Sequence, residues 1–442
     1  MTLPFRPDDL RRLELPSGAT VLALPYRRLP LLHIVLMLKH GAEVDPRDKG
    51  GLSDLVAEAL TLGTERKGAE ELSLAVERLG ASISASSGWD RSFLKVVGLA
   101  EDVEELLSLA GEVYLHPSFP PDEIAKALQR RMANLTKSRD EAERVADELI
   151  WCEMMAGTPY DHPSYGTMKS VKALSREDVV ALYNRVYSPR DTVLLIVGPL
   201  APEELLRQGE ELLGDWSFPS PYKKFPNPPS LRGRKILLVD KPDLTQSQIR
   251  IGFTGFERKA PCYLPFKVMN YILGGGGFSS RLMERVRSQK GFTYGIRSSI
   301  HPMKVPGPLI ISTFTPTETT LQTFREILAT LEDFLKGGVT DKELEEAKGY
   351  FCGNFPLRLE TPGQVAREIL ELELYGLGLD ELEFFTQRVQ EVSVEDVLRV
   401  ASEVLDLGAF RAIVLGRVKD LEGAFRDWGE VEIKSFADVA SQ

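Results

Sequence analysis

The sequence is poor in the residues that build disulfide frameworks and metal centres. It contains only three cysteines and five histidines among 442 residues. The cysteines, Cys152, Cys262 and Cys352, stand far apart and form no C-x-x-C pair, so we expect buried free thiols in a reducing compartment. The histidines are scattered without the spacing of metal ligands. Both shortages argue against a disulfide-stapled domain and against a metal centre built on cysteine or histidine.

Long apolar runs and an excess of positive charge are also missing. No uninterrupted apolar segment is long enough to cross a bilayer. The first nine residues lack the charged and apolar regions of a signal peptide, so we expect a cytoplasmic protein. The net charge of -11 at pH 7 argues against binding to nucleic acid phosphates. With 43% hydrophobic and 27% charged residues, the composition is that of a globular protein, and the length suits two or three domains.

The chain contains signs of an internal duplication. Ser175 and Ser393 each begin an S-x-x-D capping box that predicts the start of a helix, and they are 393 − 175 = 218 residues apart. Each predicted helix is followed by a β-branched strand that ends in glycine, at Gly198 and Gly416, again 416 − 198 = 218 residues apart. A period of this length indicates two homologous domains and excludes a solenoid of short repeats.

A proline-rich segment divides the two copies. We assign residues 1–217 to an N-terminal domain, 218–232 to a stiff linker and 233–442 to a C-terminal domain. Short alternating strands mix with long amphipathic helices in each half, which predicts an α+β fold with one mainly antiparallel sheet per domain and helices packed on it. The clearest strands are expected at 33–38, 248–253 and 309–314, and the clearest helices at 103–114, 122–135 and 321–335.

Residues 51–64 form the most informative segment. Their apolar side chains recur at helical spacing, which predicts an amphipathic helix with one buried face made of Leu52, Leu55, Val56, Ala59 and Leu60. The frame resembles the zinc-binding helix of the pitrilysin/insulinase-like zinc peptidases, the inverzincins, which carries H-x-x-E-H. The two histidine positions are Asp54 and Glu58 here, and the position of the general base is Ala57. The resemblance extends over nearly the whole chain.

The residues at these positions do not suit zinc. The resemblance implies a third ligand, a glutamate, on a later helix, but residues 130–137 contain no acidic residue, and Asn134 is the degenerate position. Ala57 cannot accept a proton. Two carboxylates four residues apart suit a harder cation or solvent. We expect Asp54 and Glu58 to be solvated acids near a helix start, and we expect no metal and no other cofactor in this chain.

The second half carries the other family signature intact. The Gly-rich segment 273–282 lacks the Lys-Ser/Thr of a phosphate loop, so its glycines are expected to permit tight backbone geometry. Arg287 and Tyr294 have the spacing of the family's arginine/tyrosine pair. The resemblance implies that the tyrosine hydroxyl donates to the scissile carbonyl as it becomes an oxyanion and that the arginine binds peptide backbone nearby. The alternative is a surface arginine at a helix end and a tyrosine that opens a strand.

The resemblance also implies how substrate binds. An extended peptide would add a strand to a sheet edge, which by analogy is segment 80–86, although this segment also suits an ordinary edge strand. The predicted substrate-binding residues are Gly80, Ala81, Ser82, Ile83, Ser84, Ala85, Gly275, Gly276 and Phe278.

Some members of this family divide the two signatures between two chains, as in heterodimeric bacterial members and the processing-peptidase alpha subunit. We therefore expect a zinc-free subunit of a heterodimeric metallopeptidase, whose H-x-x-E-H partner holds the zinc. The two chains would close as a clamshell around an unstructured peptide, with Tyr294 opposite the zinc of the partner.

Two alternatives stay open. One is a non-catalytic structural or peptide-binding descendant, like the core subunits that some respiratory complexes retain. The other is an independent metallopeptidase that uses an unrecognised site. Neither a nucleic acid nor a membrane is expected as a partner.

Overall fold

The computed structural model describes residues 5–214, 216, 227–418 and 421–440. The chain forms two compact units, and each is assembled from three segments. Unit 1 contains Met1–Leu135, Pro163–Lys224 and Asn354–Phe384, and unit 2 contains Thr136–His162, Phe225–Gly353 and Phe385–Gln442. The domain limits expected from the sequence, 1–217 and 233–442, stay a prediction, and residues 218–226 of the expected linker lie outside the described part. Each unit combines chain from both halves of the sequence.

Unit 1 is built on a six-stranded sheet with the strand order β1-β2-β6-β3-β5-β4. Neighbouring strands are antiparallel except β2 and β6, which are parallel. Every residue of β6 is buried, as expected of an apolar central strand covered on both faces. The strands are β1 Arg11–Glu14, β2 Thr20–Pro25, β3 Leu31–Leu38, β4 Ser82–Ser87, β5 Ser92–Leu99 and β6 Thr192–Gly198.

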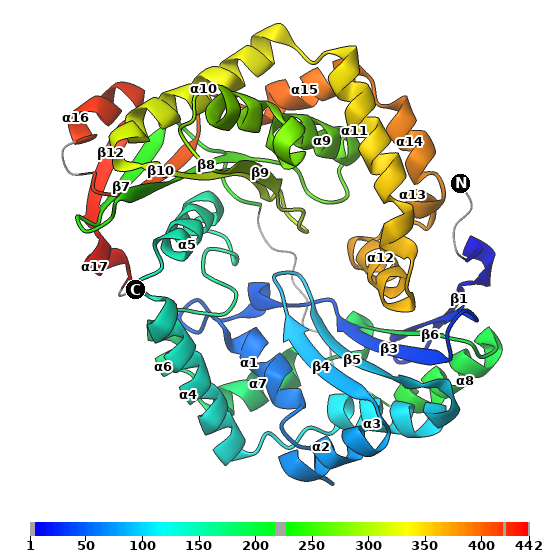
Figure 1. The fold of residues 1–442 in the computed structure, drawn as a ribbon. Helices are drawn as coiled ribbons and strands as arrows, with labels where there is room; N and C mark the ends of the chain where they lie inside the picture. The colour runs from blue at the N-terminus through cyan, green and yellow to red at the C-terminus, as the bar shows by residue number, and fades with distance from the viewer. Residues whose placement is uncertain (1–4, 215, 217–226, 419–420, 441–442) are drawn as a thin grey trace. The chain divides into compact units, whose positions relative to one another are not determined.

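Helices cover both faces of this sheet (Figure 1). Helix α12 packs on β3 and β6, and α1, α3 and α8 contact the strands from the opposite face. The helices of unit 1 are α1 Leu52–Leu60, α2 Ala69–Arg78, α3 Val103–Leu115, α4 Pro121–Ser138, α6 Met168–Lys172, α7 Arg176–Val186, α8 Pro202–Leu213, α12 Pro362–Tyr375 and α13 Asp380–Glu383.

Unit 2 repeats this design with a second six-stranded sheet, ordered β12-β7-β11-β8-β10-β9. Strands β8, β10 and β9 pair antiparallel, as do β8 and β11, whereas β7 is parallel to β11 and β12. The strands are β7 Lys235–Asp240, β8 Gln246–Thr254, β9 Ile296–Ile300, β10 Pro308–Pro316, β11 Arg411–Gly416 and β12 Glu430–Ser435. The expected α+β class, with mostly antiparallel sheets and packed helices, is confirmed.

Helix α5 covers one face of the second sheet, and α9, α10 and α15 lie on the other (Figure 1). The helices are α5 Ala142–Met155, α9 Tyr263–Asn270, α10 Thr320–Gly337, α11 Asp341–Asn354, which continues to the border with unit 1, α14 Phe385–Glu391, α15 Val394–Val404, α16 Glu422–Phe425 and α17 Phe436–Ala440. Two short π-helices are present: η5 Tyr271–Gly275, which overlaps the start of the Gly-rich segment, and η7 Met283–Gln289, which follows its end.

The duplication is visible in the elements themselves. Ser175 and Ser393 both form the expected capping boxes, which begin α7 and α15. Helices α5 and α12 also correspond, since their first residues are 362 − 142 = 220 positions apart. Each of these two helices packs on the sheet of the other half of the sequence. The repeats therefore exchange equivalent helices, so that each sheet has both faces covered.

Polar contacts fasten the exchanged helices. In unit 2, Arg250 is 1% exposed and forms an ion pair with Asp147 of α5. Its guanidinium also donates to the carbonyl oxygen of Thr313 at 3.1 Å. In unit 1, Glu373 of α12 accepts from Arg12 at 2.6 Å and from Lys39 at 3.1 Å. Each contact joins segments far apart in the sequence. It therefore stabilises the packing of the helix in its unit and not only the helix itself.

The three cysteines are free, as expected, but they are only partly buried. The expectation of free thiols is confirmed, and the expectation that they are buried holds only in part. No helix among the described residues combines the length and the apolar character needed to cross a membrane.

Candidate functional site

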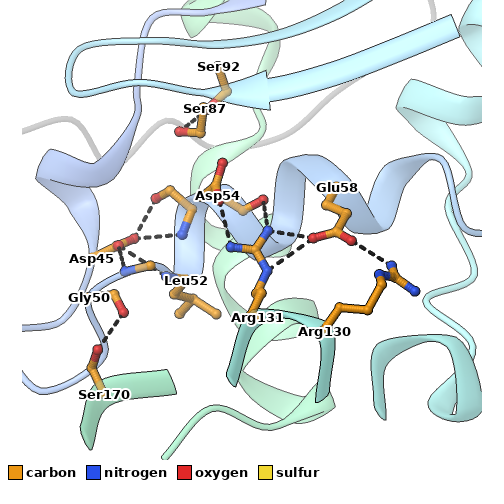
Figure 2. Close-up of polar contacts among 12 residues, drawn as sticks. Asp45, Gly50, Leu52, Asp54, Glu58, Ser87, Ser92, Arg130, Arg131 and Ser170 are labelled. Carbon is orange, nitrogen blue, oxygen red and sulfur yellow. Dashed lines mark hydrogen bonds and ion pairs between the residues drawn. The ribbon is translucent and has the colours of Figure 1, made fainter. Parts of the chain in front are cut away.

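A buried carboxylate fixes the start of α1. Gly51 precedes the helix with a positive φ of 91° and, because it has no side chain, cannot cap the helix. Asp45 takes over this role, because it accepts hydrogen bonds from the backbone N–H groups of Gly51 at 2.8 Å, Leu52 at 3.1 Å and Ser53 at 2.8 Å (Figure 2). Burial raises the pKa of Asp45 to about 7, although the hydrogen bonds from Ser53 and Gly51 oppose the shift.

Helix α1 has the two faces that the sequence predicts. Leu52, Leu55, Val56, Ala59 and Leu60 are all buried in the core of unit 1. Asp54 and Glu58 lie on the remaining face, where their carboxylates point toward α4 (Figure 2). Ala57, at the position of the family's general base, is 0% exposed and packs inside the unit.

The carboxylates of Asp54 and Glu58 are bound by arginines of α4. Arg131 donates from Nη1 to Asp54 Oδ2 at 2.6 Å, and from Nη2 and Nε to Glu58 Oε2 at 2.6 and 3.0 Å. Its Nη2 also donates to the backbone carbonyl of Asp54 at 3.0 Å. Arg130 donates to the second oxygen of Glu58 at 2.7 Å. The expectation of solvated acids near the helix start was therefore wrong, because both acids are ion-paired and Glu58 lies near the end of α1.

The electrostatics match this arrangement. Burial alone would lower the pKa of Arg131, but the charges and hydrogen bonds of Asp54 and Glu58 outweigh it and raise the pKa of the guanidinium. Burial would likewise raise the pKa of Glu58, but the hydrogen bond from Arg130 and the charge of Arg131 hold it below its usual value. Two positive and two negative charges balance at this point.

These residues do not fit a zinc ion. The space between the two carboxylates is taken by the Arg131 guanidinium, and Ala57 has no proton acceptor. Asn134, the expected degenerate ligand position, lies about one turn beyond Arg131 on α4. Within the described ranges, no group of three or more histidine, cysteine, aspartate or glutamate side chains is arranged to hold a metal.

Strand β4 lies beside α1 at the edge of the first sheet. It covers most of the predicted substrate-binding segment 80–86 and begins at Ser82, after Gly80 and Ala81. Its exposure alternates: Ser82 and Ser84 are exposed, and Ile83 and Ala85 pack partly on the core. Strand β5 is its partner in the sheet. An edge strand with small polar side chains outward offers main-chain hydrogen bonds to an extended peptide.

The Gly-rich segment 273–282 lies in unit 2, where its first three residues belong to the π-helix η5 and its last residue precedes η7. A Cβ atom on Gly274 would lie 2.7 Å from the backbone nitrogen of Ser298, so this position accepts only glycine. Gly277 has a φ of +63°, which favours glycine as well. Directly after it, Phe278 is 70% exposed. The expected tight backbone geometry is present, and it presents an aromatic side chain to solvent.

The structure brings Phe278 and Arg287 together. Arg287 belongs to the π-helix η7, and its guanidinium carbon lies 4.5 Å from the centre of the Phe278 ring. Tyr294 lies two residues before β9, the edge strand of the second sheet, and is 81% exposed. The side chains of Phe278 and Tyr294 are the most exposed of the large hydrophobic residues in the described structure.

A cavity of about 400 Å³ lies beside these residues in unit 2. Gly275 and Gly277 form part of its wall, with β9 and the buried Arg250. Its lining is rich in backbone and small polar groups. Among the predicted substrate-binding residues of this half, Gly275 lines the cavity and Phe278 contacts Arg287, whereas Gly276 packs toward Tyr271.

Three important residues were not predicted from the sequence: Arg130, Arg131 and Asp45. A signal for the arginines existed, since two adjacent cations stand in the segment where the family's third acidic ligand was sought. Asp45 had a weaker signal, an acidic residue six positions before the glycine at a predicted helix start.

Comparison with known families agrees with this architecture. Residues 30–168 match the family described as insulinase (peptidase family M16), and residues 173–350 match the domain described as the peptidase M16 inactive domain. The chain belongs to this family. It does so without the H-x-x-E-H residues on α1.

Similar proteins include a Helicobacter pylori protein named non-peptidase homolog YmxG, 25% identical over 403 residues that cover 89% of this chain and 90% of the relative. An uncharacterized zinc protease from Mycobacterium leprae is 24% identical over 410 residues, covering 92% and 91%. The solved structure of a peptidase M16 inactive domain from Pseudomonas fluorescens superimposes with a TM-score of 0.87 at 25% identity, covering 92% of this chain and 97% of that one.

Proposed function

We propose that this chain is the zinc-free subunit of a two-chain metallopeptidase that hydrolyses unstructured peptides. It supplies Arg287 and Tyr294, and a homologous partner chain supplies H-x-x-E-H and the zinc ion. The zinc of the partner would provide the activated water. This chain would bind no metal itself and would act where the two proteins meet, without nucleic acid or membrane and, as the sequence suggests, in the cytoplasm.

The chemistry assigned to this chain is electrostatic. A tyrosine hydroxyl is a neutral donor that strengthens its hydrogen bond as a peptide carbonyl gains negative charge. Arg287 adds a cation, and its stacking on Phe278 restricts the guanidinium before substrate arrives. Neither residue can activate water, so the chain alone would be inactive.

The observation that carries the proposal is the exposure of Tyr294. At 81% exposed, its ring contributes little to the core of unit 2. An exposed aromatic with a hydroxyl, close in sequence to an arginine that is held by a second exposed aromatic, has the composition of a binding hot spot. The site on α1 supports the same proposal. The Arg131 guanidinium lies between Asp54 and Glu58, so another chain would have to activate the water.

The second candidate is a non-catalytic structural or peptide-binding protein. The name of the Helicobacter pylori relative, which describes a non-peptidase, favours it. The two candidate functions differ in the role of the Tyr294 hydroxyl. The metallopeptidase subunit needs it for catalysis, and the non-catalytic protein does not.

The deciding experiment reconstitutes this chain with a family member that carries H-x-x-E-H and measures cleavage of an unstructured peptide. Tyr294→Phe removes one oxygen atom, and we expect kcat to fall by about 10²–10³-fold because a transition-state donor is lost. Assembly, followed by gel filtration, should be unchanged. Tyr350→Phe is the matched control, since Tyr350 is a second exposed tyrosine in unit 2 and stacks on Tyr271.

Two results would reject the proposal. If Tyr294→Phe cleaves as fast as the unaltered pair, the hydroxyl has no part in catalysis and the non-catalytic candidate is favoured. If this chain alone cleaves peptide and loses that activity with a chelator, it is an independent metallopeptidase.

A further inference from the structure

The Asp54/Glu58 pair and the arginines of α4 form a cross-link between two helices. Helix α1 contributes one carboxylate from each of two successive turns, and α4 contributes a planar cation that reaches both. The side chain of Arg131 is only 13% exposed, so the contact is sheltered from solvent. In the first half of the sequence, α1 packs on β4, and the position of that edge strand therefore depends on how α1 is held.

A metal ion at such a site has a mechanical effect besides its chemistry, since it joins ligands from separate elements. The guanidinium of Arg131 likewise joins groups from two separate helices. It contacts both i and i+4 positions of α1, and it is covalently part of α4. Arg130 adds a second positive charge on Glu58, so two cations balance two carboxylates.

We propose that Arg131 replaces the metal ion as a built-in cation, and that it positions α1 and the adjoining edge strand β4 through an organic cross-link. Arg131 is a positioning residue in this assignment and touches no substrate. The inference does not depend on the proposed function, because it concerns the isolated chain. It explains how the fold around an abandoned metal position keeps its geometry.

The test removes the cation and then supplies another. In Arg131→Ala, the carboxylates of Asp54 and Glu58 face each other across an empty space, and we expect the Tm of the isolated chain to fall by about 4–8 °C. Because carboxylate oxygens bind hard divalent ions, millimolar Mn²⁺ should recover at least half of this loss. Guanidinium chloride at low millimolar concentration should also recover part of it. Unaltered protein should respond to neither addition.

The matched control is Arg281→Ala. Arg281 makes a bidentate ion pair of similar exposure with Glu343, at 2.6 and 2.7 Å, but it leaves only one carboxylate behind. Its Tm should fall and should not recover with Mn²⁺. If Arg131→Ala unfolds on expression, Arg131→Lys serves instead: the single ammonium group cannot reach both carboxylates as the planar fork does, and a smaller fall with Mn²⁺ recovery is expected.

The inference is overturned if the Tm of the Arg131 variant equals that of unaltered protein. It is also overturned if Mn²⁺ or guanidinium raises the Tm of the Arg131 variant no more than it raises the Tm of Arg281→Ala. Both outcomes are independent of peptide cleavage, so they leave the proposed function to be judged by its own experiment.

Discussion

His33 is a buried titratable residue that no proposed step uses. It lies on β3 of unit 1, and its ring faces Gly363 of α12 and the ammonium group of Lys95. Nδ1 is buried without a hydrogen-bond partner in the described structure. Burial, and secondarily the charge of Lys95, lower the pKa of His33 to about 4 from 6.5. The folded state therefore holds this imidazole neutral where the unfolded chain would protonate it.

This shift sets a pH window for stability. Between pH 6.5 and about 4 the unfolded state binds a proton that the folded state does not, so the free energy of unfolding falls as the pH is lowered. The His33 contribution is at most about 1.4 kcal/mol for each pH unit. We expect His33→Leu to flatten the Tm profile in this window, measured by thermal melts at successive pH values. Lys95→Met should shrink the window. An unchanged slope in the leucine variant would show that other groups dominate.

Phe278 offers a second prediction at the residue scale. Removing its ring in Phe278→Ala frees the Arg287 guanidinium, and exposed cation–π contacts contribute about 0.5–1 kcal/mol. In the reconstituted pair we expect kcat/KM to fall by roughly 2–5-fold, with peptide kinetics as the measurement. Phe278→Tyr keeps an aromatic face and should retain the activity. If the tyrosine variant loses as much as the alanine variant, stacking is not the cause.

A sequence indicates the role of a residue only where that role depends on a short, local sequence pattern. The presence of Asp54, Ala57 and Glu58 in place of H-x-x-E-H was evident from one segment. The pairing of these acids with Arg131 could not be read in the same way, because it depends on the crossing of two helices that are 131 − 54 = 77 residues apart. The sequence alone does not show whether an acidic side chain contacts water or the side chain of an arginine.

At the scale of elements, the exchanged helix α5 is held both by close apolar packing and by a polar contact. A Cβ atom on Gly252 of β8 would meet Met154 of α5 at 2.6 Å and Ile150 at 3.2 Å, so α5 lies very close to the sheet. Arg250, two residues before Gly252 on β8, is a polar anchor.

We therefore expect Arg250→Met to loosen α5. The substitution leaves buried carbonyl oxygens without their donor, at a cost of about 2–4 kcal/mol. Amide hydrogen exchange, read by mass spectrometry, should rise in residues 142–155 before it rises elsewhere in unit 2. Asp147→Asn keeps a hydrogen-bond acceptor for the arginine and serves as a milder control. Uniform loss of protection across unit 2 would argue against a local anchor.

The regular elements were predictable, and the irregular ones were not. Apolar periodicity located the strands at 33–38, 248–253 and 309–314 and the helices at 103–114, 122–135 and 321–335, and the structure confirms each with slightly longer bounds. The π-helix that carries Arg287 was missed, because a single wide turn depends on local backbone fit and leaves no period in the sequence. The Gly-rich segment indicated unusual backbone geometry in this region, but it did not indicate a π-helix.

For the whole molecule, the central fact is that neither half of the sequence covers both faces of its own sheet. Along β3, Leu32, Ile34 and Leu36 belong to the core on one face, and Val35 and Met37 are buried on the other, where α12 packs. Amphipathic periodicity predicts that α12 and α5 bury one face, but it cannot say against which sheet. Only tertiary structure resolves that choice.

The exchange predicts that the halves depend on each other for folding. A fragment of residues 1–216 lacks α12 and would expose the apolar side chains of β3 and β6, and a fragment of residues 227–442 lacks α5. We expect each fragment alone to aggregate or to lack a cooperative thermal transition by circular dichroism, because exposed apolar sheet surface is costly. Refolded together, the fragments should restore the transition.

The control is the intact protein cut once between residues 217 and 226 by an inserted protease site, since it contains both fragments in folded form, with residues 217–226 still attached to their ends. Its Tm should match that of the refolded mixture, because both hold the same pairing of α5 and α12 with their sheets. A cooperative transition of the 1–216 fragment alone, near the Tm of the cut protein, would contradict the prediction. It would mean that the first sheet tolerates one open face and that α12 is not needed for its stability.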